Sequence, residues 1–311
     1  MEMQALIDPF NRLVSDACPP DVVRAIEAGG DPGPAWHLFE QSGFLDALVP
    51  EHAGGAGLEL ADAAPLLALL GGHAVPLPVG DTMIARALIV LADRVPPPGP
   101  IVLAAGAGPT PFAGVAQHAL VVAGCSIAQV SVDAVVPVDA HLTGRLVAGA
   151  TVATFSAGRD SLRPISAVLR ALLIAGAVAR VLDMTVDYAN QRSQFGKPIG
   201  KLQAVQQQLA VLAEQSVAAR IAAQIGCRNG LAPSSIDAAI AKHGASVAAV
   251  EATAIAHAVH GAIGISEEFD LQLLTRALHC WRLADGAESY WAAILGFGRA
   301  ASECGSIDLL R

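Results

Sequence analysis

The chain has 311 residues, of which 53% are hydrophobic and 15% charged, and its formal net charge is −9. That length favours two or three subdomains with a large buried core and buried subunit interfaces, and the acidic balance argues against nucleic-acid binding because no basic field surrounds the molecule. No apolar run reaches about 18 residues without a charge or a breaker, so no membrane span is expected, and the N-terminus shows no signal-peptide pattern, which favours a cytoplasmic protein.

Five cysteines are scattered through the chain, and none of them forms a CxxC pair. An odd, dispersed set of cysteines without an export signal indicates reduced thiols. We interpret each as structural in preference to a metal ligand or a nucleophile, and we expect no metal site. The five are Cys18, Cys125, Cys227, Cys280 and Cys304.

Residues 1–97 are predicted to form an N-terminal helical domain. Apolar residues recur at helical spacing in AWHLFEQSGFLDALV, in LADAAPLLALLGGHA and in DTMIARALIVLA. The glycine-rich text VPEHAGGAGLEL between the first two of these indicates a loop.

Residues 98–158 are predicted to form a small β middle domain. The text VPPPGP ends the helical region, because consecutive prolines cannot continue a helix. Short β-branched or apolar runs punctuated by glycine and proline follow, which is typical of strands. The runs are IVLAAG, HALVVAG and AQVSVDAVVPV, and the region ends near RLVAGATVATF. The glycine-rich text AAGAGPTPFAG is a poor dinucleotide-binding motif, because prolines stand where a helix would start.

Residues 159–311 are predicted to form a C-terminal bundle of four or five antiparallel helices. Long stretches with a 3.6-residue apolar period cover 165–192, 201–227 and 234–261, and shorter ones follow at 274–283 and 289–301. Ser234 or Ser235 is the expected N-cap of the third helix, since Asp237 falls in its first turn. The predicted fold class is therefore mainly α with a small β middle domain.

Three motifs in this order resemble the acyl-CoA dehydrogenase family. The stretch YANQRSQFGKPIGKLQAVQQQLA (188–210) resembles the family's Arg-x-x-Phe-Gly signature with a downstream Gln. The stretch AKHGASVAAVEATAIAHAVHGAIGISEEF (241–269) is similar to its His-Gly-Gly helix end, and SGFLDALVPEHAGGAGL (42–58) is similar to its N-terminal loop. The resemblance extends over nearly the whole chain.

The resemblance implies bound FAD, an acyl-CoA substrate, an electron-transfer acceptor and a dimer or dimer of dimers. In that family the loop around Arg192 reaches a neighbouring subunit's FAD. There Arg192 would bond a diphosphate oxygen, Phe195 would pack near the adenine and Gln203 would add a hydrogen bond. Gly196 would allow a tight turn and Pro198 would restart the helix. The alternative is an ordinary helix–helix turn with a solvated basic rim.

The resemblance also assigns residues at the end of the 234–261 helix and beyond it. His260 and Gly261 match the family's cofactor-contacting motif, although His260 also fits a satisfied core histidine. The family's proton-abstracting Glu falls on Asp285, with Gly286 after it. Asp285 is one methylene shorter than the family's Glu, which displaces its carboxylate. Two interpretations stay open: Asp285 is the proton-abstracting base, or it is an ordinary Asp in a turn beside a Gly. Glu288 is a second candidate carboxylate.

Several positions depart from the family pattern. Alanines stand at 258, 262 and 287, where the family has residues that touch FAD. The middle segment is only about 60 residues long, and all three tryptophans of the chain lie outside it. This chain alone is therefore expected to supply fewer of the residues that contact FAD in the family.

These departures are explained together if the chain is one subunit of a heteromeric dehydrogenase. A fuller partner would supply the β-barrel and most of the FAD site, in a heterotetramer in place of a homodimer or homotetramer. The expected activity is FAD-dependent oxidation of an acyl-CoA to the 2,3-enoyl-CoA. Two alternatives stay open: a non-catalytic subunit that stabilises a true dehydrogenase, and a relative that has other chemistry or has lost FAD.

Overall fold

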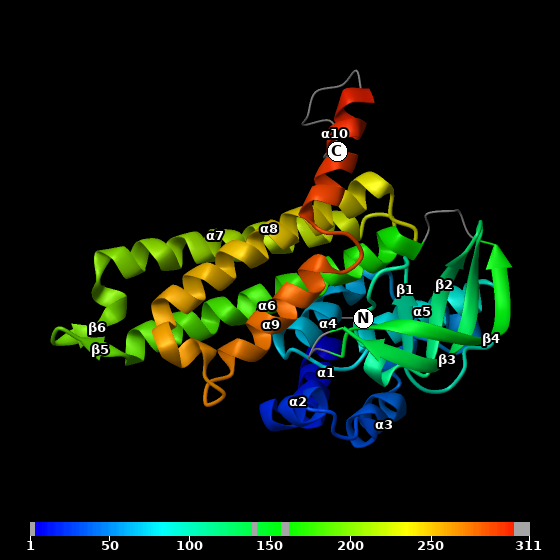
Figure 1. The fold of residues 1–311 in the computed structure, drawn as a ribbon, viewed down its shortest axis with the longest axis horizontal. Helices are drawn as coiled ribbons and strands as arrows, with labels where there is room; N and C mark the ends of the chain where they lie inside the picture. Colours follow the sequence, from blue (N-terminus) through cyan, green and yellow to red (C-terminus); the bar gives the residue numbers. More distant parts are fainter. Residues whose placement is uncertain (1–3, 139–141, 157–161, 302–311) are drawn as a thin grey trace.

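The computed structural model describes residues 4–138, 142–156 and 162–301. Helices come first along the chain, a small sheet follows, and a long helical bundle completes the fold (Figure 1). The predicted fold class, mainly α with a small β region between two helical parts, is confirmed. The proposed boundaries at 97 and 158 stay predictions, although all four strands of the sheet fall between them.

Five helices make up the N-terminal region, and the predicted loop rich in glycine separates the third from the fourth. The helix α4 (Leu60–Gly72) is apolar over most of its surface because it packs between α1 (Gln4–Ala17) and the bundle helix α6 (Leu162–Gln191). The helices are α1 (Gln4–Ala17), α2 (Pro20–Glu27), α3 (Gly33–Ser42), α4 (Leu60–Gly72) and α5 (Val79–Leu91).

The sheet contains four strands in the order β1-β2-β3-β4, which is an open arrangement with two edges. The first pair is parallel and the other two pairs are antiparallel. All three predicted runs are strands, and the fourth strand covers the text at which the region was expected to end. The strands are β1 (Ile101–Ala104), β2 (His118–Ala123), β3 (Ser126–Pro137) and β4 (Gly144–Ser156).

Two side chains of α5 attach β1 to the helical part of the molecule. The Thr82 hydroxyl accepts a hydrogen bond from the Ile101 N–H at 3.0 Å and donates one to the Ile101 carbonyl at 3.1 Å. The Asp81 carboxylate accepts from the Leu103 N–H at 3.2 Å. Because β1 is buried along its whole length, these bonds satisfy backbone groups that water cannot reach.

The bundle is built around α6, whose first half is buried on nearly every side. The helices from 162 to 283 run along the bundle, whereas the last helix, α10 (Glu288–Ala301), projects away from it (Figure 1). The Ser234 hydroxyl accepts from the Asp237 N–H at 3.0 Å, which confirms Ser234 as the N-cap of the third helix. The helices are α6 (Leu162–Gln191), α7 (Gln203–Gly226), α8 (Ser235–His260), α9 (Leu271–Leu283) and α10 (Glu288–Ala301).

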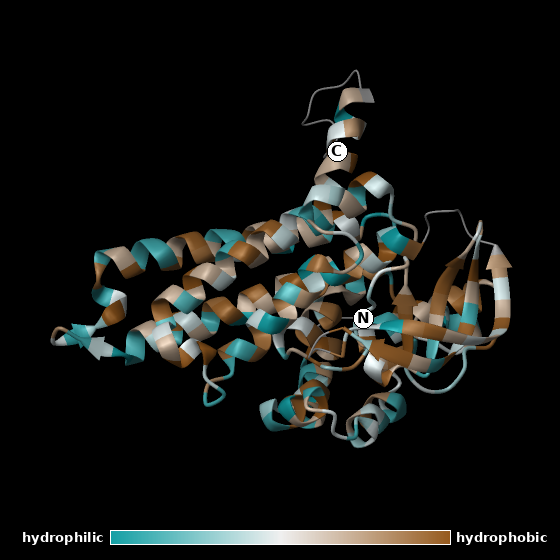
Figure 2. Ribbon diagram, viewed as in Figure 1, coloured by the Kyte–Doolittle hydropathy of each residue, from teal (hydrophilic) through white to brown (hydrophobic). Residues whose placement is uncertain are grey.

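The sequence analysis found no uninterrupted apolar run of about 18 residues, but two helical segments of the fold are apolar over such a length. These are helix α6 and the segment Ser235–Ile265 that contains α8. In the fold, 78% of the most apolar window of α6 and 44% of that of the α8 segment are buried inside the protein. Their apolar residues therefore serve helix–helix packing, because the bundle core lies between them (Figure 2).

Candidate functional site

The stretch between α6 and α7 forms a short β-hairpin at one tip of the bundle (Figure 1). Its strands are β5 (Ser193–Gln194) and β6 (Lys197–Pro198). The two residues that link them, Phe195 and Gly196, have φ values of 52° and 76°, as a type I′ turn requires. The predicted tight turn at Gly196 is confirmed. Pro198 does not restart the helix: it lies in β6, and a 3₁₀ turn precedes α7.

The side chains that were expected to hold the cofactor face outward from this hairpin. Arg192, Phe195 and Gln203 are all exposed, and the hairpin strands are coloured hydrophilic in Figure 2. The backbone of Arg192 is fixed, because its N–H donates to the Tyr188 carbonyl and its carbonyl accepts from Ile199, both at 2.8 Å. The hairpin therefore presents a positive charge and an aromatic ring on a fixed backbone.

Phe195 is 87% exposed and occupies a left-handed backbone conformation. Both properties are unfavourable for a large aromatic residue in an isolated chain: the conformation is strained, and the ring gains nothing from burial. Strain of this kind is concentrated at binding sites.

His260 and Gly261 lie at the same end of the bundle as the hairpin. The His260 ring is buried and stacks on Tyr188 with ring centroids 4.4 Å apart, and Phe269 lies 5.1 Å away. Its Nδ1 bonds the Ala256 carbonyl at 2.8 Å, whereas Nε2 has no partner among the described residues. Burial lowers the pKa of this histidine. His260 thus joins α6 to α8, and Gly261, with φ 65°, is exposed beside it.

Asp285, Gly286 and Glu288 lie at the other end of α9, around the turn that leads into α10. Because α9 has 13 residues, its two ends are about 20 Å apart. The structure therefore does not bring the hairpin residues and Asp285 together within one chain (Figure 1).

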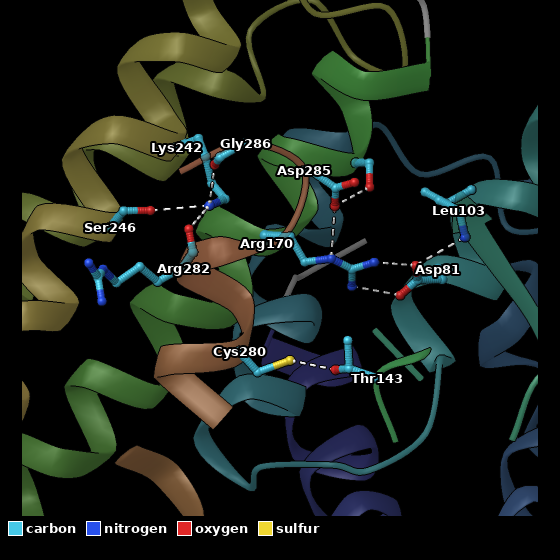
Figure 3. Close-up of polar contacts among 11 residues, drawn as sticks. Asp81, Leu103, Thr143, Arg170, Lys242, Ser246, Cys280, Arg282, Asp285 and Gly286 are labelled. Atoms are coloured by element: carbon cyan, nitrogen blue, oxygen red, sulfur yellow. Dashed lines mark hydrogen bonds and ion pairs between the residues drawn. The ribbon is translucent and has the colours of Figure 1, made fainter. Parts of the chain in front are cut away.

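The carboxylate of Asp285 is held inside a buried polar cluster (Figure 3). Its Oδ2 accepts from the Ser166 hydroxyl at 2.6 Å and from Arg170 Nε at 3.2 Å. The Arg170 guanidinium is fully buried, and its two terminal nitrogens bond the Asp81 carboxylate at 2.9 and 2.5 Å. Burial by itself would lower the pKa of Arg170, but the pairing with Asp81 raises it.

Lys242 reaches the same turn from α8. Its ammonium donates to the carbonyls of Arg282 and Gly286, at 2.7 and 3.1 Å, and to the Ser246 hydroxyl at 3.2 Å (Figure 3). Burial lowers the pKa of Lys242 to about 7, against the opposing effect of Asp285 and Glu288.

Glu288 begins α10 and pairs with the guanidinium of Arg282. Partial burial raises the pKa of its carboxyl, but the hydrogen bond and the charge of Arg282 outweigh that effect, and the pKa is lowered overall. A carboxylate held in this way is a weak proton acceptor.

Sequence reasoning did not single out Asp81, Ser166, Arg170 or Lys242. A signal was present for the two basic residues, since each interrupts an apolar face, in SAVLRALLIAG and in DAAIAKHGASV. Charged residues on the buried side of a helix are almost always paired. The sequence alone does not identify the pairing partners, because they come from distant helices.

A cavity of about 490 Å³ lies between the sheet and the start of α6. The loop after β1, residues 104–108, lines one side, and Arg145 and Arg163 lie on the others. A three-residue 3₁₀ turn (Ala113–Val115) follows this loop where a dinucleotide-binding motif would have an α-helix. Two guanidinium groups beside a small-residue loop suit an anionic ligand. Asp285 is not among the residues that line this cavity.

Comparison with known proteins identifies consistent relatives. Residues 165–296 match the family model of the acyl-CoA dehydrogenase C-terminal domain. Acyl-CoA dehydrogenase IpdE2 of Mycolicibacterium smegmatis is 34% identical over 291 residues, which cover 89% of this chain and 92% of the relative. Its counterpart in Mycobacterium tuberculosis is 33% identical over 302 residues, with 89% and 91% covered.

Solved structures show the same fold at low sequence identity. The ChsE4–ChsE5 complex from Mycobacterium tuberculosis superposes with a TM-score of 0.82 at 21% identity, covering 98% of this chain and 99% of that one. The Tcur3481–Tcur3483 steroid enzyme gives a TM-score of 0.83 at 23% identity, with 97% and 99% covered.

Proposed function

This chain belongs to the acyl-CoA dehydrogenase family, and we propose that it is one subunit of a heteromeric, FAD-dependent dehydrogenase that oxidises an acyl-CoA to the 2,3-enoyl-CoA. Members of the family are oxidoreductases that act on the CH–CH bond of an acyl-CoA. In this reaction FAD, when bound, accepts the hydride. The chain's own contribution is to hold the cofactor of a neighbouring subunit.

The observation that carries the proposal is the position of the hairpin. Arg192, Phe195 and Gln203 are exposed at the far tip of the bundle. Arg170 contacts Asp285, and Arg192 lies 22 residues farther on, just after the end of α6, which is a rise of about 33 Å. An exposed arginine is suited to a diphosphate, since its planar fork makes paired hydrogen bonds to phosphate oxygens. The exposed ring of Phe195 is suited to the flat face of an adenine. These groups fit FAD only if it belongs to a neighbour.

The remainder of the chain fits FAD less well. Alanine replaces cofactor-contacting residues of the family at 258, 262 and 287, and the sheet is open with four strands. The partner is therefore expected to cover the flavin. A heteromer is also suggested by two similar folds, which come from a ChsE4–ChsE5 complex and a two-component steroid enzyme. A bulky, steroid-like acyl-CoA is the substrate class that follows from this similarity.

Co-expression with a candidate partner dehydrogenase tests the proposal. The complex should retain FAD through desalting, and Arg192→Ala should weaken FAD retention by about tenfold or more, because one charge-assisted hydrogen bond contributes about 1.5–3 kcal/mol. Arg220→Ala, which removes an exposed arginine farther along α7, is the matched control and should leave FAD content unchanged. Equal FAD content in both variants would contradict the role given to the hairpin.

A non-catalytic role for this chain is the second candidate, and one observation favours it. The carboxylate expected to act as the base is engaged by Arg170 and Ser166. A subunit of this kind would hold the cofactor and stabilise the complex, while its partner performs the proton transfer.

A further inference from the structure

We propose that Asp285 is an anchoring residue, whose carboxylate is clamped by Arg170 and Ser166 to fix the turn between α9 and α10, and that the proton-abstracting base is carried by the partner subunit. This inference rests on the proposed function for its second part only. The first part concerns this chain alone and follows from contacts that cross four elements: α5, α6, α8 and the turn itself.

A general base must bring a carboxylate oxygen within hydrogen-bond distance of the proton that it removes, so a carboxylate whose position is fixed elsewhere is poorly suited to the role. Asp285 Oδ2 accepts from both Ser166 and Arg170, and the side chain is only 8% exposed. Arg170 cannot turn away to release it, because its terminal nitrogens are bonded to Asp81. Asp81 is in turn held by the backbone N–H of Leu103. Three consecutive contacts thus fix the carboxylate: Leu103 of β1 holds Asp81, Asp81 holds Arg170, and Arg170 holds Asp285.

The carboxylate of Asp285 also contributes to the charge balance around a buried cation. Arg170 is fully buried and lies between two carboxylates, Asp81 and Asp285. Replacing the Asp285 carboxylate would remove one of the two charges that stabilise a cation that water cannot reach. The carboxylate of Asp285 therefore balances a buried charge, which is the role of an anchoring group.

The backbone of the turn indicates an anchor as well. Asp285 has φ 57° and Gly286 has φ 112°, left-handed conformations that Asp and Gly tolerate and that surrounding contacts hold in place. Those contacts are present: Lys242 donates to the Gly286 carbonyl, and a Cβ on Gly286 would lie 2.7 Å from Trp291 Nε1. The Asp285 side chain therefore supplies one of several fixed points that set the start of α10.

The stability of the assembled complex tests the anchor without any substrate. Asp285→Asn should lower the Tm by about 3–8 °C, and Arg170→Met should lower it further, because that change leaves buried carboxylates unpaired. The double variant should regain several degrees over Arg170→Met alone, since it removes one of those carboxylates. Hydrogen exchange of residues 284–290 should rise in the single variants. Asp187→Asn, at an exposed position of α6, should change neither measurement.

Additive losses of Tm in the double variant would overturn the anchor, and so would unchanged exchange in the turn. The base assignment is tested by flavin bleaching in the same complexes, with butyryl-CoA and a steroid-side-chain acyl-CoA as probes. Asp285→Asn should reduce the flavin at a rate within about threefold of the unmodified complex. A loss of about 100-fold or more with an unchanged Tm would make Asp285 the base.

These readouts also separate the inference from the proposed function. If neither probe bleaches the unmodified complex, the proposed dehydrogenase activity on these substrates fails, while the Tm and exchange results still decide whether Asp285 is an anchor. If the complex is bleached normally and the Tm pattern is absent, the anchor fails and the proposed function stands.

Discussion

Two basic side chains are buried at the junction between the bundle and the rest of the molecule. Arg170 is compensated by two carboxylates, whereas Lys242 has two carbonyls and a hydroxyl. A guanidinium stays charged when it is buried, but an ammonium releases its proton readily. The two residues should therefore respond differently to pH.

We expect the stability of the chain to depend on pH through Lys242. The unfolded chain keeps this proton up to the ordinary pKa near 10.5, but the folded chain releases it near 7. Between these values the unfolded state binds more protons, so stability rises with pH, by at most about 1.4 kcal/mol per pH unit. Urea unfolding of wild type and Lys242→Met at pH 7, 8 and 9 should show a difference that moves in favour of the wild type. A constant difference would contradict the burial of a titrating amine.

Gly286 offers a second test at the residue scale. An added Cβ would lie 2.7 Å from both Trp291 Nε1 and Tyr290 Cδ1, at a φ of 112°. Gly286→Ala should therefore destabilise the chain by roughly 1–3 kcal/mol. Gly296→Ala is the matched control: it lies within α10 with open space around it and should stabilise the chain by about 0.5–1 kcal/mol. Equal effects in urea unfolding would rule out the tight fit of the turn.

At the scale of single elements, the hairpin between α6 and α7 differs from the connections around it. It is short and regular, and it has an exposed aromatic residue in a left-handed conformation at its tip. A solvated helix–helix turn requires none of these features. A hairpin that contacts a neighbouring subunit's cofactor accounts for all of them. Helix α10 is a second element that extends away from the bundle, and its Phe297 is 77% exposed (Figure 1).

Phe195→Asn should have opposite effects in the isolated chain and in the complex. Asparagine tolerates the left-handed region, so the isolated chain should be as stable as wild type or more stable by up to about 1 kcal/mol. The complex should lose FAD at least severalfold more readily, because the ring is gone. The checks are urea unfolding of the chain and flavin absorbance of the desalted complex. Unchanged FAD retention would show that the ring has no cofactor role.

At the scale of the whole molecule, the N-terminal helices join the bundle through a glycine contact. A Cβ on Gly71 of α4 would lie 1.9 Å from the Leu173 carbonyl of α6, and one on Gly176 of α6 would lie 1.8 Å from the Ala68 carbonyl. The two backbones therefore touch where these helices cross. The contact sets the position of α5 and β1 relative to α6, and with them the position of Asp81 next to Arg170.

Gly71→Ala should disturb this crossing, and Gly72→Ala should not. The added methyl at 71 meets backbone and should cost roughly 1–3 kcal/mol, whereas at 72 the nearest atom is 3.4 Å away, an ordinary contact. Thermal unfolding of the two variants gives the comparison. If Gly71→Ala were as stable as Gly72→Ala, the close approach of the two helices would be refuted.

The elements themselves could be predicted because their patterns are local. Apolar spacing located every long helix of the bundle and the strands of the sheet, and proline or glycine marked most of the breaks. Pro198 was the exception: a proline near a helix start is typical of the first turn, but here it completes a hairpin strand instead. The choice between the two depends on the pairing of Ser193 with Pro198, which single-residue preferences do not describe.

The sequence by itself determined the family, the order of helices and strands, and the position of the tight turn at Gly196, since all of these depend on neighbouring residues. Only the tertiary structure decided what surrounds Asp285. Ser166 and Arg170 are separated from it by more than 100 positions and contact it directly, and Asp81 contacts Arg170. These residues come together because α4 and α6 cross closely and α9 returns along the bundle. Whether a carboxylate is a base or an anchor depends on such contacts, because they decide where its oxygens are held.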